Sequence, residues 1–129
     1  MFEVTVEKSF AAGHALRGYR GKCENVHGHN YKIRVTLEGE QLDPIGLLYD
    51  FKDLKADIVR TVDRLDHQFM NDIPPFDQLN PSAENLARYF YEESEKYLAA
   101  AHPANGVRIK SVTVWETDVT TATYYKTAG

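Results

Sequence analysis

Hydrophobic and polar residues alternate along the chain with the two-residue period of a β-strand. The alternation begins at residues 2–7 and is most regular over 27–38. One face of the second segment carries His27, His29, Tyr31, Ile33, Val35 and Leu37. Two further strands are predicted at 107–116 and 122–126. The glycines and basic residues of 11–26 predict an irregular connection instead.

Two helices are predicted between the second and third strands. Asp50 can cap a helix, and apolar residues follow it at helical spacing: Phe51, Leu54, Ile58, Val62 and Leu65. A second helix is expected to start around 80–82, with Pro81 in its first turn. Its predicted buried stripe comprises Leu86, Phe90 and Tyr97. The order strand, strand, helix, helix, strand, strand predicts one α+β domain over residues 1–129.

The predicted sheet has features that favour an assembly. Four strands leave two open edges, which invite pairing with other subunits. The even-numbered face of the second strand is also polar and charged. If the sheets of several subunits join into a barrel, their open edges are paired. The polar face of each sheet then lines a water-filled interior.

The composition narrows the class of protein. A net charge of −4 argues against a general nucleic-acid binder. One cysteine cannot form an internal disulfide, which favours a reducing compartment. Residues 1–8 lack the apolar core of a signal peptide, and no segment reaches the ~20 apolar residues of a membrane span. We therefore expect a cytoplasmic protein that binds neither nucleic acid nor membranes.

Three of the five histidines fall within sixteen residues. His27 and His29 lie two apart in a predicted strand, so both imidazoles point to the same face. His14 can supply a third nitrogen from the preceding segment. Three protein ligands and an open fourth position are typical of catalytic zinc. Imidazole also suits copper, nickel and iron, and zinc is favoured by its frequency.

The single cysteine has three interpretations. Cys23 is a fourth zinc ligand, an inert buried thiol, or a thiolate base beside the metal. A neighbouring dication and Lys22 would lower its pKa and favour the reactive form. Spacing alone leaves these interpretations open. Basic residues of the same segment, Arg17 and Arg20 with Lys22, are either solvated or hold phosphates that enter the site.

Two more positions carry candidate chemistry. Asp66 and His67 are adjacent at the predicted end of the first helix. Such a pair is commonly a solvated terminus, but a carboxylate beside an imidazole also orients a general acid and keeps it charged. Glu116 is either a plain carboxylate at a strand end or, in a pocket, an acceptor of two parallel N–H bonds.

Together these residues resemble the 6-pyruvoyl-tetrahydropterin synthase family and its close relative, 6-carboxytetrahydropterin synthase. The resemblance covers nearly the whole sequence. Its motifs are Phe10-Ala-Ala-Gly-His14, Cys23-x3-His27-Gly-His29-Asn-Tyr31, Leu48-Tyr-Asp-Phe51, Leu65-Asp-His67, Asn80-Pro-Ser-Ala-Glu-Asn85 and Trp115-Glu-Thr117. It implies the tunnelling fold, a four-stranded antiparallel sheet with two helices between strands 2 and 3. It also implies a homohexamer, a dimer of trimers that encloses a barrel, with active sites at subunit interfaces.

The resemblance implies three groups of site residues: zinc ligands, proton-transfer residues and pterin contacts. They are, in that order, His14, His27 and His29; Cys23, Asp66 and His67; and Glu116, Ser82 and Ala83. The implied substrate is dihydroneopterin triphosphate. Zinc would acidify C–H bonds in the side chain of this substrate, the thiolate would remove a proton, and the aspartate–histidine pair would return one.

The resemblance extends to more than one product. The three-residue gap between Cys23 and His27 resembles the bacterial carboxytetrahydropterin synthases of queuosine and deazapurine biosynthesis. Glu24 overlaps the pattern of variants that cleave the side chain to 6-hydroxymethyldihydropterin for folate synthesis, or it has no role. We expect a zinc-dependent lyase that forms 6-carboxytetrahydropterin, with 6-pyruvoyl-tetrahydropterin formation or folate-type cleavage as alternatives.

Two hypotheses of other kinds remain at this point. One is a non-catalytic, zinc-stabilised module that binds a pterin or nucleotide, with Cys23 closing the metal site. The other is a small hydrolase that uses zinc-bound water. Replacement of Cys23 would be nearly silent in such a hydrolase.

Overall fold

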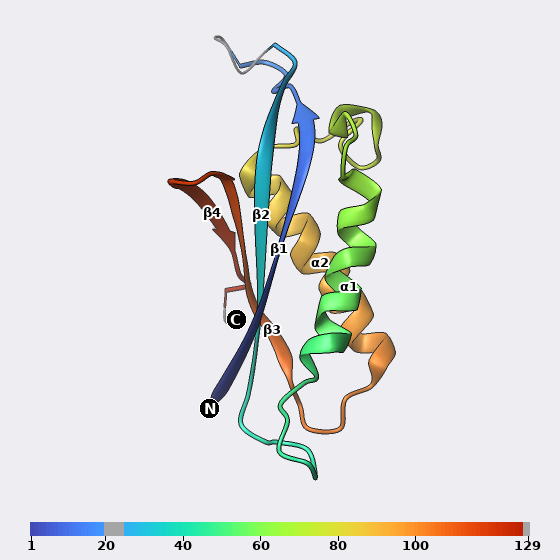
Figure 1. Ribbon diagram of the computed structural model, residues 1–129, viewed down its shortest axis with the longest axis vertical. Helices are drawn as coiled ribbons and strands as arrows, with labels where there is room; N and C mark the ends of the chain where they lie inside the picture. Colours follow the sequence, from blue (N-terminus) through green and yellow to red (C-terminus); the bar gives the residue numbers. More distant parts are fainter. Residues whose placement is uncertain (20–24, 128–129) are drawn as a thin grey trace.

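The computed structural model describes residues 1–19 and 25–127. In this part of the protein the elements are β1 (Phe2–His14), β2 (His27–Gly39), α1 (Phe51–Leu65), the 3₁₀ turn η2 (Met70–Asp72), α2 (Ala83–Ala101), β3 (Arg108–Thr117) and β4 (Thr120–Tyr124) (Figure 1). The strands form one antiparallel sheet in the order β1-β2-β3-β4. This order confirms the predicted α+β fold, with both long helices between the second and third strands.

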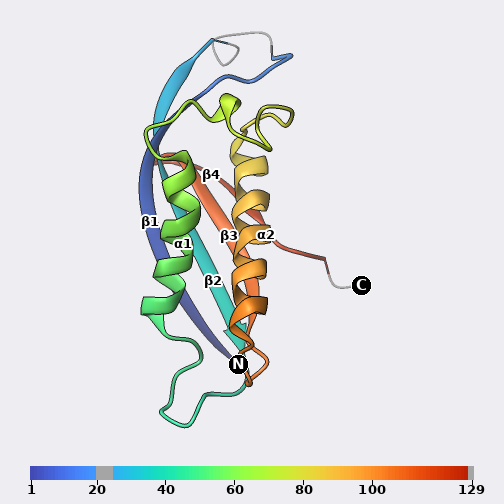
Figure 2. The same cartoon turned by 90° about the vertical axis from the view of Figure 1, so that its right-hand side faces the viewer.

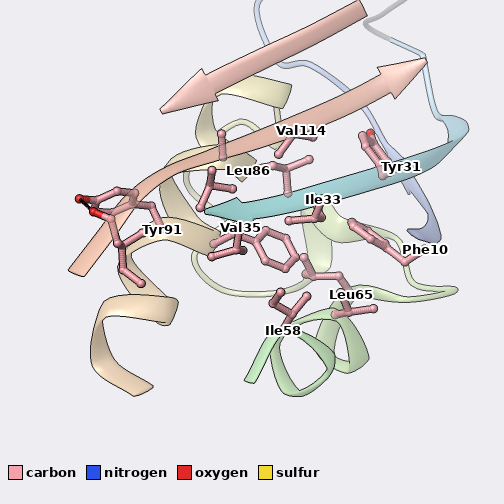
Figure 3. Close-up of a cluster of buried hydrophobic side chains, with 14 of the residues drawn as sticks. Phe10, Tyr31, Ile33, Val35, Ile58, Leu65, Leu86, Tyr91 and Val114 are labelled. Carbon is pink, nitrogen blue, oxygen red and sulfur yellow. Dashed lines mark hydrogen bonds between the residues drawn. The ribbon is translucent and has the colours of Figure 1, made fainter. Parts of the chain in front are cut away.

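Both long helices lie on one face of the sheet. Figure 2 shows α1 and α2 side by side across it, with α1 over β1 and α2 over β3. The odd-numbered apolar residues of β2 point into the space between these layers. Ile33 and Val35 meet Ile58 of α1 and Leu86 of α2 there, and all four are buried (Figure 3). The core therefore lies on the same face of β2 that carries His27 and His29.

The first strand is longer than its sequence suggests. We expected residues 11–26 to be irregular, and this was wrong for 11–14, which pair with 27–30 of β2. Alanine and glycine are poor strand formers, but pairing on both sides overrides that preference. On the side away from β2, the N–H of Gly13 donates to the carbonyl of Gln68 (2.9 Å). This extension brings His14 opposite His27.

The helix boundaries follow from their caps. Asp50 accepts a hydrogen bond from the N–H of Lys52, as predicted, and α1 buries every residue of its predicted stripe except Phe51. Ser82 caps α2 by accepting from the N–H of Asn85 (3.2 Å). Pro81 therefore precedes the helix, and its expected place in the first turn was wrong. Tyr97 is only half-buried, because Ser94 and Leu98 occupy the buried positions of that part of the stripe.

Charged side chains occupy the other face of the sheet. Arg34 pairs with Glu7 (2.7 Å) and Arg108 with Glu38 (3.1 Å). Trp115 lies beneath the cations of Lys32 and Arg34. No helix or strand of the described residues covers this face.

We expect Ile33→Ala to lower the free energy of unfolding by about 2–5 kcal/mol, because it leaves a cavity between the sheet and both helices. The matched control is Ile45→Ala, at a side chain that is 80% exposed, and it should change stability by less than about 0.5 kcal/mol. Urea unfolding of both variants at one protein concentration measures the difference. Equal losses would contradict this position of the core.

Candidate metal centre

Three imidazoles converge where β1 and β2 meet. The strand register pairs His14 with His27 and places His29 two residues further along the same face. The ring centroids are 4.5–5.0 Å apart, and one nitrogen from each ring lies within 4.8 Å of the other two. The structure thus brings the three predicted ligands together into a group that can hold a metal ion.

Backbone carbonyls fix the tautomers of two of these histidines. The Nδ1–H of His14 donates to the carbonyl of Pro81, and that of His27 to the carbonyl of Asn25, each at 2.7 Å. A carbonyl can only accept, so both protons lie on Nδ1 and both Nε2 atoms keep their lone pairs. These two Nε2 atoms are 2.9 Å apart. Two lone pairs at that distance repel unless a cation or a proton lies near both.

The third histidine presents a nitrogen without a partner. The Nε2 of His29 is buried and finds no hydrogen bond within residues 1–19 and 25–127. The nearest carboxylate oxygen, Oε1 of Glu116, lies 3.4 Å from it but is not aligned as an acceptor. A buried polar atom without a partner costs free energy, and a metal ion would satisfy it. The donor set therefore fits a metal that prefers imidazole ligands.

Burial tunes the ionisable groups of this site. His14 is only 1% exposed, and burial lowers the pKa of its imidazole, which keeps the ring neutral and able to bind a metal. Burial and the nearby Glu116 carboxylate raise the pKa of Tyr31, so its hydroxyl stays protonated. Burial thus keeps one of the three candidate ligands, His14, in the form that can bind a cation.

The Asp66–His67 pair is held in place by the edge of β1. Asp66 accepts from the N–H of Ala11 (3.1 Å), and the N–H of His67 donates to the carbonyl of Ala11 (2.6 Å). The two side chains meet at 3.0 Å between Oδ1 and Nδ1. The Ala11 hydrogen bond and the neighbouring His67 lower the pKa of Asp66. His67 adopts a left-handed backbone (φ 59°), and its imidazole is 80% exposed, so the pair is oriented but open to a ligand.

Two hollows lie beside these groups. The first, of about 500 Å³, is lined by His29, by His67 and by residues 11–13 of β1, so one of the three histidines and one member of the Asp66–His67 pair border the same hollow. The second, of about 470 Å³, is lined by Glu116, by Ala83 at the start of α2 and by the threonines of β4. Ser82 lies beside it, but its hydroxyl already caps α2. Two of the three predicted pterin contacts therefore share one hollow.

A family model described as 6-pyruvoyl tetrahydropterin synthase matches residues 3–127. The chain belongs to the 6-pyruvoyl tetrahydropterin synthase family. It is 32% identical over 130 residues to the 6-carboxy-5,6,7,8-tetrahydropterin synthase of Synechocystis, covering 97% of this chain and 94% of that protein. It is 33% identical over 100 residues to the enzyme of the same name from Haemophilus influenzae, covering 74% and 67%.

The fold agrees with that of a solved member of the family. The structure of 6-pyruvoyl tetrahydropterin synthase from Caenorhabditis elegans matches 98% of both chains, with a TM-score of 0.81 and 32% identity. The predicted tunnelling fold is thus confirmed. No helix in the described part of this family member is long and apolar enough to cross a membrane.

The remaining predicted residues belong to the segment of the sequence between β1 and β2. Cys23 and Glu24, with Arg20 and Lys22, lie outside the described residues. Arg17 is exposed, and its guanidinium donates to the backbone carbonyls of Phe76 (2.8 Å) and Asn71 (3.4 Å). This side chain therefore holds the loop that follows η2.

The Pro81 carbonyl and the Tyr31 hydroxyl contact His14 but were not predicted as site groups. A backbone carbonyl has no signature in a sequence. The signal for Tyr31 was present, because it lies two residues after His29 on the same face of the strand.

We expect His29→Asn to weaken metal binding roughly a hundredfold. The free energy of structural zinc binding is about 10–16 kcal/mol. If four ligands contribute equally, each contributes about 3 kcal/mol, which corresponds to a factor of roughly a hundred in affinity. His102→Asn is the matched control, because His102 is an exposed helix cap with a left-handed backbone that asparagine tolerates. Competition with a chromophoric chelator measures both affinities. Equal affinity in the two variants would contradict the assignment of His29.

Proposed function

We propose that this chain is a zinc-dependent lyase that converts dihydroneopterin triphosphate to 6-carboxytetrahydropterin. The observation that carries the proposal is the convergence of three imidazole nitrogens beside a hollow that also reaches His67. Relatives named 6-carboxy-5,6,7,8-tetrahydropterin synthase support this product.

Zinc is the ion that this donor set favours. Three neutral imidazoles with a fourth position left open are typical of catalytic zinc. Backbone carbonyls hold the other ring nitrogen of His14 and of His27, as commonly occurs around zinc ligands. Zinc in this position would polarise the hydroxyls of the substrate side chain and make the attached C–H bonds more acidic.

The proposed roles of His67 and Glu116 rest on their positions, and the role of Cys23 rests on the family resemblance. The Cys23 thiolate removes a proton from the substrate side chain. His67, oriented by the Asp66 carboxylate, returns a proton at another atom. Glu116 lies in the second hollow, where its two oxygens can accept parallel N–H bonds from the pterin ring. Ala83 and Ser82 border the same ring. Loss of triphosphate and cleavage of the side chain need no organic cofactor.

The alternative product within the family is 6-pyruvoyl-tetrahydropterin. Its support is the match to the C. elegans protein, which is as similar to this chain as the Synechocystis enzyme. Folate-type cleavage to 6-hydroxymethyldihydropterin would instead use Glu24 as the base. The queuosine route is preferred because of the short gap between Cys23 and His27. A free thiol persists more readily in a reducing compartment, which supports a cytoplasmic location.

The proposed working form is a homohexamer, a dimer of trimers. Within the described residues β4 and most of β1 form open sheet edges, the charged face is uncovered, and the Asp66–His67 pair lies at the β1 edge. Pairing of β1 with β4 of another subunit would close a barrel and bring the proton-transfer pair to a subunit interface.

Incubation of the zinc-loaded protein with dihydroneopterin triphosphate should yield a carboxytetrahydropterin by mass spectrometry. Cys23→Ala should abolish that product and leave zinc bound, because the thiol acts as a base. Glu24→Gln is the matched control and should stay active. A hydroxymethylpterin that survives in Cys23→Ala would assign the chemistry to Glu24. Loss of zinc from Cys23→Ala would make the cysteine a ligand, and no product from the wild type would favour a binding module or a hydrolase.

Sedimentation equilibrium at micromolar concentration should give six times the subunit mass of 14.7 kDa. Closure of each trimer removes the open edges of its sheets, and the family resemblance implies that two trimers pair. A monomeric wild type would contradict the hexamer.

A further inference from the structure

Tyr31 is the largest fully buried side chain next to the three histidines. It lies in β2 opposite Phe10, and the two rings are stacked with centroids 5.2 Å apart (Figure 3). Its ring also meets His14 and His29 edge-on, at 5.9 and 5.6 Å. A phenylalanine would supply all of this packing, so the hydroxyl needs its own explanation.

The hydroxyl of Tyr31 contacts the ring of His14. Its oxygen lies 3.1 Å from Nδ1, in a buried position. The Nδ1–H is directed at the carbonyl of Pro81 at 2.7 Å, so the tyrosine oxygen is a second, longer acceptor of the same proton. Within the described residues, this contact with His14 is the hydrogen bond that the Tyr31 hydroxyl makes.

Two hydrogen-bond acceptors restrict the rotation of an imidazole ring more than a single acceptor does. The Pro81 carbonyl approaches His14 from the segment before α2, and the Tyr31 oxygen approaches it from β2. One contact alone leaves the ring free to turn about the hydrogen bond. The second contact opposes that rotation, and the orientation of the ring sets where the Nε2 lone pair points. Nε2 lies on the side of His27, where the metal would bind.

We propose that Tyr31 is a positioning residue for the metal centre, whose hydroxyl orients His14 so that its Nε2 faces the ion. This inference rests on the proposed metal centre and adds a residue that acts through a ligand. Outer hydrogen bonds of this kind hold ligand rings in orientation, and their loss commonly costs about 10–100-fold in metal affinity.

The test compares Tyr31→Phe with Tyr91→Phe. Tyr91 is also buried, and its hydroxyl donates to the carbonyl of Ile109 (3.2 Å), so the control loses a buried hydroxyl outside the metal centre. Cobalt(II) serves as the probe, because its visible absorption reports the arrangement of its ligands. We expect Tyr31→Phe to weaken cobalt binding at least about tenfold and to change the spectrum of the bound ion. Tyr91→Phe should leave both unchanged, and the metal-free variants should unfold at similar urea concentrations.

Three outcomes would overturn the inference. An affinity within about twofold of the wild type with an unchanged spectrum would show that the hydroxyl is not needed. A metal-free Tyr31→Phe protein that is unfolded while Tyr91→Phe is folded would assign the hydroxyl to stability. A wild type that binds neither cobalt nor zinc would contradict the metal centre, and thereby the proposed function as well. Only this last outcome would contradict both the positioning role of Tyr31 and the proposed function.

Discussion

The register of β1 against β2 sets the positions of the three histidines in the candidate metal centre. His14 faces His27 across the two strands, and His29 follows on the same face. A slip of one residue would turn His27 and His29 to the charged face and expose the apolar residues of β2. The same register buries Ile33 and Val35 under the helices. The free energy of the core thus holds the ligands in place.

The metal centre stores an electrostatic cost in the folded protein. Two Nε2 lone pairs face each other at 2.9 Å, and the Nε2 of His29 is buried without a hydrogen bond among the described residues. Such an arrangement opposes folding in the absence of a cation and favours binding of one. Burial of His14, which lowers the pKa of its imidazole, directs the site toward a metal ion rather than a proton. The free energy gained by burying the surrounding apolar residues offsets this electrostatic cost.

Much of the fold could be predicted because its signals are local. The alternation of β2, the Asp50 cap and the apolar stripe of α1 each depend on neighbouring residues, and each appears in the structure. The extension of β1 through Gly13 could not be predicted, because it depends on pairing with residues that are distant in sequence. The histidine group was predictable from spacing along one strand. The anchoring of Asp66 and His67 on Ala11 was not, because it depends on how the end of α1 meets the sheet.

X-ray absorption at the zinc edge of the zinc-loaded protein distinguishes an open catalytic site from a closed structural one. We expect three imidazole nitrogens and one further light atom at about 2.0–2.1 Å, which is an open catalytic site. A sulfur neighbour at about 2.3 Å would mean that Cys23 closes the site. That result would contradict a catalytic metal with an exchangeable position and would favour a structural zinc module.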